Sequence, residues 1–129
     1  MPKRGGFTLI ELLIILVIIA ILATMGFNRF WTARDRAHYT QMKSDLRNLA
    51  AEQEHYFQTN YAYAAAVTDM TDMYQSEGVT VTVTYALSDG WAANATHTSL
   101  PGKQCGIYTG NAPVASGAPA TVNGRIECN

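Results

Sequence analysis

The 129-residue chain has little cysteine, little proline and no excess of charge of either sign. Two cysteines are too few for a scaffold that depends on several disulfides, or for a four-ligand zinc site. The chain has nine lysines and arginines and ten aspartates and glutamates. This balance of charge excludes a nucleic-acid binder that relies on overall basicity. Proline is absent between Pro2 and Pro101, and glycine between Gly26 and Gly78, so neither residue interrupts a helix there.

Enzyme signatures are absent as well. The sequence contains no G-x-S-x-G, no H-E-x-x-H and no phosphate-cradling glycine loop. The three histidines are scattered along the chain, at His38, His55 and His97. Glu52 and His55 lie a helical turn apart without further metal ligands, and Asp69 and Asp72 fit a solvated turn better than a calcium loop. We therefore expect no catalytic activity, no cofactor and no bound metal.

Charge is nearly missing from residues 7–26, which read FTLIELLIILVIIAILATMG. Sixteen of these twenty residues are apolar, and Glu11 carries the only charge. At 1.5 Å per residue the segment covers about 30 Å, the thickness of a bilayer hydrocarbon core. A buried core helix in so small a domain would need a polar face. We therefore expect a membrane span, with Lys3 and Arg4 placing the N-terminus toward the cytoplasm.

The span is expected to stay with the mature protein, because no small-residue A-x-A site follows it. Beyond it, one side of a helix is marked by Tyr39, Met42, Leu46, Leu49, Gln53 and Tyr56. All of these are apolar except Gln53, and their 3,4,3,4,3 spacing predicts a helix face packed on another element. The sequence therefore predicts one long helix from Phe7 to Thr59.

Alternating residues predict a small sheet after the helix. Residues 79–85 read VTVTVTY, which places Val79, Val81, Val83 and Tyr85 on one face of a strand. A turn at Ser88-Asp89-Gly90 predicts a hairpin, and further strands are expected at 91–98, 104–109 and 125–128. The predicted fold class is α+β: a long N-terminal helix packed on a small antiparallel sheet, with the apolar face of the sheet on the 39–56 stripe.

Cys105 and Cys128 lie in the part of the chain expected outside the cytoplasm. A disulfide between them closes a loop of 24 residues and stabilises the fold by about 3 kcal/mol on chain-entropy grounds. The alternative is a pair of buried free thiols. An oxidising compartment favours the disulfide.

Glu11 is a charged residue within an apolar span. Such residues are costly in lipid and usually have a functional partner. No basic side chain on the span reaches Glu11, so a neighbouring copy would have to supply the cation. The alternative is a glutamate at the membrane interface that faces the lipid headgroups.

The N-terminal residues resemble the leader and start of a type IV pilin or related pseudopilin. The resemblance is carried by KRGGFTLIE at residues 3–11: a short basic leader ending in glycine, then Phe-Thr-Leu-Ile-Glu and the apolar run. It implies cleavage between Gly6 and Phe7 by a prepilin peptidase and N-methylation of Phe7. It also implies that Glu11 pairs with the Phe7 amine of a neighbouring subunit. Many relatives carry a helix-bending proline near the membrane exit, where this chain has Gly26 and Asn28.

The resemblance also implies a division of the chain into a leader (1–6), a hydrophobic assembly helix (7–28), and an amphipathic helix half with a sheet head (29–129). The expected product is a homopolymeric surface filament, built from subunits stored in inner-membrane lipid and added by an inner-membrane assembly platform. Neither a small-molecule substrate nor nucleic acid is expected. The alternatives are a type II secretion pseudopilin and, with less support, a DNA-uptake pilin; the cysteine pair favours the pilin.

Charge is distributed unevenly along the chain. Five basic residues and two acidic ones lie from Arg29 to Arg47, whereas two basic and seven acidic residues follow from Asn48 onward. This pattern predicts staggered packing in which the basic helix of one copy meets the acidic head of another. Salt is then expected to weaken the assembly.

Overall fold

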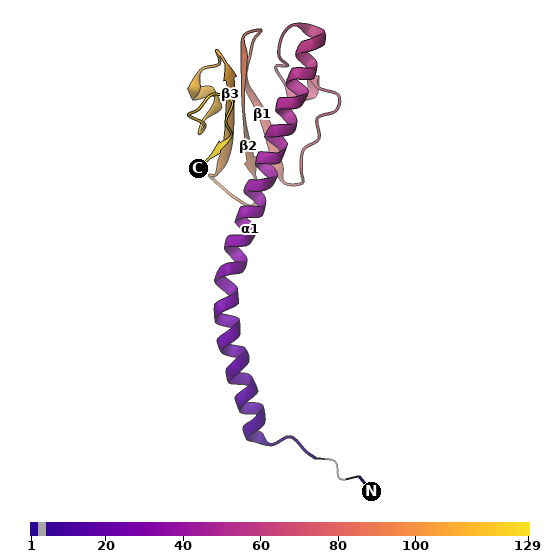
Figure 1. Cartoon of the computed structure of the whole chain (residues 1–129), viewed down its shortest axis with the longest axis vertical. Coiled ribbons are helices and arrows are strands. Elements are labelled where there is room, and N and C mark those ends of the chain that lie inside the picture. Colours follow the sequence, from indigo (N-terminus) through magenta and orange to yellow (C-terminus); the bar gives the residue numbers. More distant parts are fainter. Residues whose placement is uncertain (3–4) are drawn as a thin grey trace. The chain divides into compact units, whose positions relative to one another are not determined.

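The computed structural model describes residues 1–2 and 5–129, so the basic pair Lys3 and Arg4 lies outside the described residues. The chain divides into two compact units, Met1–Arg34 and Asp35–Asn129, which we call the N-terminal segment and the C-terminal domain. Helix α1, Leu9–Asn60, belongs to both units, and the strands lie in the C-terminal domain (Figure 1).

Helix α1 runs without interruption through Gly26, although glycine costs a helix about 1 kcal/mol relative to alanine. It ends where Tyr61 adopts a left-handed backbone with φ of 54°. There the Tyr61 N–H donates to the carbonyl of Phe57 over 2.8 Å, which satisfies one of the last helical carbonyls. The predicted helix is confirmed, and its ends differ from the predicted Phe7 and Thr59 by the one or two residues over which helix ends fray.

The strands form one antiparallel sheet in the order β1-β2-β3-β4. Their bounds are β1 Val79–Ala86, β2 Gly90–His97, β3 Gln104–Gly110 and β4 Glu127–Cys128. The Leu87 N–H donates to the Gly90 carbonyl over 3.0 Å in the predicted hairpin turn between β1 and β2. Two short 3₁₀ turns complete the elements: η1, Val67–Asp69, lies in the loop before β1, and η2, Val114–Gly117, lies in the loop between β3 and β4. The α+β prediction is confirmed, with β4 shorter than the expected 125–128.

The main core lies between α1 and one face of the sheet (Figure 1). From the helix, Met42, Leu46 and Leu49 are fully buried. They pack with buried strand residues that include Val79, Val81, Ala93, Ala95 and Ile107. The predicted packing of the helix stripe on the apolar face of the sheet is confirmed.

Gln53 occupies the gap in the apolar helix stripe and is also fully buried. Its side-chain Nε2 donates to the Ala64 carbonyl over 2.9 Å, and its Oε1 accepts from the Ala64 N–H over 2.8 Å. Both polar ends of the amide are thereby satisfied, which removes the cost of burying it. Gln53 thus ties the loop after α1 to the helix that precedes it.

The prediction for Tyr85 is wrong. A β-bulge lies between Val83 and Tyr85, so that Val83 pairs with Ala93 while Tyr85 pairs with the adjacent Ala92. The extra residue, Thr84, shifts the alternation by one and turns Tyr85 to the opposite face of the sheet from Val79, Val81 and Val83.

On that opposite face Tyr85 joins a second apolar cluster formed by Ala92, Tyr108, Ala112 and Ala120. Residues 112–120, which lie between β3 and β4, cover this face of the sheet. Gly106 and Gly117 permit the close approach, because a Cβ on either residue would collide with the backbone of the other segment. The C-terminal domain therefore buries both faces of its sheet.

Candidate functional site

The N-terminal half of α1 presents an apolar surface with no core of its own. Every large apolar side chain from Phe7 to Trp31 is exposed, and the least exposed, Ile15, is 44% accessible. Among the described residues, α1 is also the helix that is long and apolar enough to cross a membrane by length and composition. Monomeric soluble proteins rarely expose apolar surface on this scale, so it marks contact with lipid or with other protein chains.

The residues just before this surface are open to solvent. Gly6 and Phe7 precede the first helical turn, and Phe7 is 74% exposed. No heavy atom lies within 4 Å of the position that a Cβ on Gly6 would take. The peptide bond between Gly6 and Phe7 therefore lies outside the helix, in a part of the chain that is open to solvent.

Glu11 has a partner within its own chain that sequence reasoning missed. Its Oε2 accepts from the backbone N–H of Thr8 and from the Thr8 hydroxyl, each over 2.9 Å, while the Glu11 N–H donates to Thr8 Oγ1 over 3.3 Å. This reciprocal arrangement is a capping box, in which each side chain satisfies a backbone N–H of the first helical turn. The signal was present as Thr8-Leu9-Ile10-Glu11, the S/T-x-x-E pattern before an apolar run.

The predicted disulfide is present between Cys105 of β3 and Cys128 of β4. These two residues face each other in the strand pairing, where only Gly106 and Glu127 form a second pair. Near the disulfide, Tyr39 of α1 donates from its hydroxyl to the Asn129 carbonyl over 2.8 Å. The bond thus holds a very short strand to the sheet and brings the last residues beside α1.

Asp45 of α1 is a buried carboxylate. It is 1% exposed, and its two oxygens accept from the backbone N–H of Ser76 over 2.7 Å and from the Ser76 hydroxyl over 2.8 Å. Because 31 residues separate the two partners, no local pattern identifies this pair.

Two of the three histidines come together, contrary to their description as scattered. The rings of His38 in α1 and His97 in β2 lie 4.0 Å apart between centroids. His97 is buried, and its Nδ1 accepts from the Ser99 N–H over 3.0 Å. Burial, with a smaller contribution from His38, lowers the pKa of His97 below the ordinary value of 6.5.

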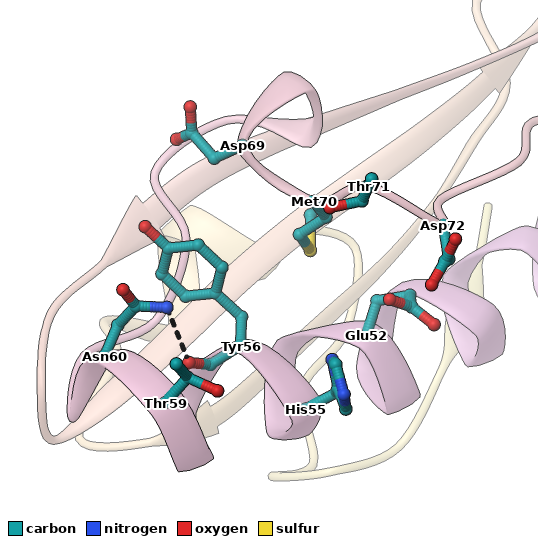
Figure 2. A pocket seen from close by; sticks show the side chains of 9 residues that line it. All are labelled: Glu52, His55, Tyr56, Thr59, Asn60, Asp69, Met70, Thr71 and Asp72. Atoms are coloured by element: carbon teal, nitrogen blue, oxygen red, sulfur yellow. Dashed lines mark hydrogen bonds between the residues drawn. The ribbon is translucent and has the colours of Figure 1, made fainter.

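The residues considered as metal ligands also gather around one hollow between α1 and the following loop. Figure 2 shows Glu52 and His55 from the helix with Asp69 and Asp72 from the loop. Asp69 uses its carboxylate to accept the Ala66 N–H over 3.1 Å. Among the described residues, no group of three or more such side chains has the arrangement to hold a metal ion.

Comparisons with known proteins agree with the geometry of the N-terminal segment. Residues 1–27 match the family described as the prokaryotic N-terminal methylation motif. The chain is 33% identical over 129 residues to the type IV wide pilus major component PilA4 of Thermus thermophilus, covering 92% of this chain and 97% of that protein.

Two further relatives match about half of this chain. The type II secretion system core protein G of Pseudomonas aeruginosa is 36% identical over 61 residues, which are 47% of this chain and 43% of that protein. The type IV major pilin protein PilA of Myxococcus xanthus is 35% identical over 63 residues, or 49% of this chain and 29% of that protein.

Proposed function

Because this chain belongs to the type IV pilin family, we propose that it is a structural subunit of a type IV pilus or a related surface filament. The observation that carries the proposal is the apolar half of α1, whose side chains are exposed all around the helix. Lipid covers this surface in the stored precursor, and the same segments of neighbouring subunits cover it in the filament. The C-terminal domain, folded around its own core, remains outside the membrane.

The same proposal assigns the chain's processing. Residues 1–6 are a leader that a prepilin peptidase removes after Gly6, and the new amine of Phe7 is then methylated. Residues 7–28 are the membrane and assembly segment, and residues 29–129 carry the rest of the helix and the sheet. The subunit passes from the inner membrane, through an assembly platform, into a homopolymer at the cell surface.

Glu11 is proposed to pair with the Phe7 amine of a neighbouring subunit. Each group is costly to place alone in an apolar interior, and the cost is much lower when the two are paired. The pairing therefore favours the axial offset between neighbouring subunits that brings Glu11 to the Phe7 amine. The capping box with Thr8 does not compete with this role, because Thr8 remains after cleavage and a carboxylate has further lone pairs to offer.

The Glu11→Gln variant separates the two roles of this residue. Glutamine serves in a capping box but carries no charge. We expect Glu11→Gln to leave membrane insertion intact and to reduce filament yield at least tenfold. The matched variant Thr8→Ala removes the cap and keeps the charge, and is expected to assemble better than Glu11→Gln. Normal filament yield from Glu11→Gln would contradict the proposed pairing.

Electron microscopy with gold-labelled antibodies against the C-terminal domain tests the proposed function. Fibres sheared from cells that express the chain should carry the label along their length, and cells lacking it should have none. The similarity to a type II secretion core protein favours a secretion pseudopilin as the second candidate. Loss of protein secretion in the deletion strain, with no labelled fibres on wild-type cells, would favour that second function.

A further inference from the structure

One flank of α1 in the C-terminal domain carries a row of basic side chains, which we call the basic flank: Arg36, Lys43 and Arg47. Arg36 and Lys43 line a hollow beside Cys128 and Asn129. Lys43 and Arg47 line the next hollow along the helix, beside Ile126 and its neighbours at the edge of β4. At 100° per residue, the three positions fall within about 40° of one another around the helix axis.

Among the described residues, no carboxylate forms an ion pair with the basic flank of its own subunit. In the part of the chain that the structure describes, the ion pair present joins Arg125 to Glu127 over 3.8 Å and leaves the three helix cations without a carboxylate within 4.0 Å. Asp45 does not neutralise them, because it is buried and bonded to Ser76. The charge of the basic flank is therefore available to another molecule.

The opposite flank of the same helix is acidic. It comprises Glu52 of α1 with Asp69 and Asp72 of the following loop, around the hollow shown in Figure 2. We call these three residues the acidic flank. The buried residues Met42, Leu46, Leu49 and Gln53 run between the two flanks and face the sheet. In Figure 1 the 61–78 segment lies on one side of α1, and β3 and the C-terminal residues lie on the other.

We propose that the basic flank of one subunit binds the acidic flank of a second copy of this chain, an inference that rests on the proposed function as a filament subunit. The two surfaces differ and lie on opposite sides of the domain, so the contact is heterologous. A heterologous contact leaves a free basic flank and a free acidic flank at the ends of every oligomer, and growth continues as an open helical polymer. A two-fold symmetric contact of either flank with itself would oppose like charges.

Charge reversal in two separate variants tests this interface. The variant Lys43→Glu/Arg47→Glu has two acidic flanks, and the variant Glu52→Lys/Asp72→Lys has two basic flanks. Asp69 is kept, because its carboxylate accepts the Ala66 N–H. Each variant alone is expected to yield at least tenfold fewer sheared filaments than the wild type. Coexpressed, the two variants offer complementary flanks to each other, and the yield should return to within about twofold of wild type, with both chains in each filament.

Two controls separate this result from a folding defect. Thermal unfolding of each purified variant should match the wild type, and the coexpression arm excludes misfolding because unfolded subunits could not rescue each other. Lys103→Glu changes the net charge as much as Arg47→Glu does, but lies in the turn between β2 and β3, outside both flanks. It should assemble normally, whereas Arg47→Glu should not.

The outcomes distinguish the interface from the function on which it rests. If the wild type forms filaments but the charge-reversal variants also assemble normally, the proposed interface is wrong. The same holds if coexpression does not restore the filament yield. In both cases the proposed function is not contradicted. Lost membrane association of Lys43→Glu/Arg47→Glu, with normal filament yield, would assign the basic flank to anionic lipid and also overturn it. No filaments from the wild type itself would contradict the proposed function and the interface together.

Discussion

Asp45 is a charged side chain of α1 that serves the interior of the C-terminal domain. In place of water, its buried carboxylate accepts hydrogen bonds from the N–H and the hydroxyl of Ser76. These bonds hold the 70–78 part of the loop against the helix. Gln53 does the same for Ala64 at the start of that loop. A buried acceptor that loses its donors incurs the full cost of desolvation, and so does a buried donor that loses its acceptor. These two polar residues therefore position the loop that carries Asp69 and Asp72 of the acidic flank.

Replacing Asp45 by alanine should lower the free energy of unfolding of the C-terminal domain by about 1–3 kcal/mol, because the N–H and hydroxyl of the half-buried Ser76 lose their acceptors. Chemical denaturation of the detergent-solubilised chain, followed by tryptophan fluorescence, measures the change. Asp72→Ala removes an exposed carboxylate from the same region and should change the stability by less than about 0.5 kcal/mol. Equal effects of the two variants would contradict the role given to Asp45.

His97 should make the domain less stable in mild acid. Burial lowers its pKa in the folded state below 6.5, so below that pH the unfolded chain binds the proton more readily. Stability should fall as the pH is lowered from about 7.5 to about 5, and the melting temperature should fall with it. His97→Gln should flatten this dependence, and the exposed His55→Gln should leave it unchanged. An unaltered pH dependence in His97→Gln would argue against His97 as its source.

Glu127 titrates outside this range and does not obscure the test. Hydrogen bonds from the Thr121 hydroxyl and backbone N–H lower the pKa of its carboxyl below 4.5. Its contribution is therefore complete above pH 4.5 and is lost only as the pH falls further. Of the other titratable groups, His38 is in ring contact with His97, and Glu77 lines the same hollow.

At the scale of the elements, the two halves of α1 differ in what surrounds their side chains. From Met42 onward one face is buried against the sheet, whereas the large apolar side chains from Phe7 to Trp31 are exposed. Periodicity in the sequence identifies both halves, because an amphipathic stripe and an unbroken apolar run are local patterns. The strands were predictable for the same reason.

Contacts between distant segments were not predictable in this way. The bulge at Thr84 turns Tyr85 away from the predicted face, and nothing in the alternation of residues 79–85 indicates it. The pairing of Asp45 with Ser76 and the meeting of His38 with His97 depend on how the chain folds back on itself. At the candidate site, by contrast, the prediction of a disulfide between Cys105 and Cys128 is confirmed, whereas the roles given to Phe7 and Glu11 stay predictions. The capping box was equally visible but was not recognised.

Strand β4 depends on its disulfide, because it pairs with β3 through only two residue pairs. The double variant Cys105→Ala/Cys128→Ala should lower the free energy of unfolding of the C-terminal domain by about 3 kcal/mol. Hydrogen exchange should also become faster at residues 127–128 than in β2. Unchanged stability of this variant, or two free thiols in the native wild-type protein, would contradict the stabilising role of the disulfide.

At the scale of the whole molecule, the near-neutral composition conceals three regions of different chemistry. The apolar segment 7–28 carries Glu11 as its only charge, the helix that follows is basic, and the rest of the chain is acidic. The structure places two of these charge sets on opposite flanks of the C-terminal domain. The proposed self-association then has two components: a non-directional one from the apolar helix, and a directional one from the pairing of the flanks.

Sodium chloride should weaken the directional component. Raising the ionic strength from about 0.01 M to about 1 M shortens the Debye length from about 30 Å to about 3 Å, so attraction between the flanks is screened. Filament yield from the wild type should fall over this range, as measured by sedimentation. The coexpressed charge-reversal variants should show the same salt dependence. Assembly that is indifferent to salt would count against attraction between the flanks.

The most direct test of the chain as a processed filament subunit is mass spectrometry of the protein in purified surface fibres. We expect fibres composed of this chain, lacking residues 1–6, with an N-terminal methylated Phe7. The same sample should contain Cys105 and Cys128 in disulfide linkage. Fibres without this chain, or fibre subunits that still begin at Met1, would contradict the proposed function.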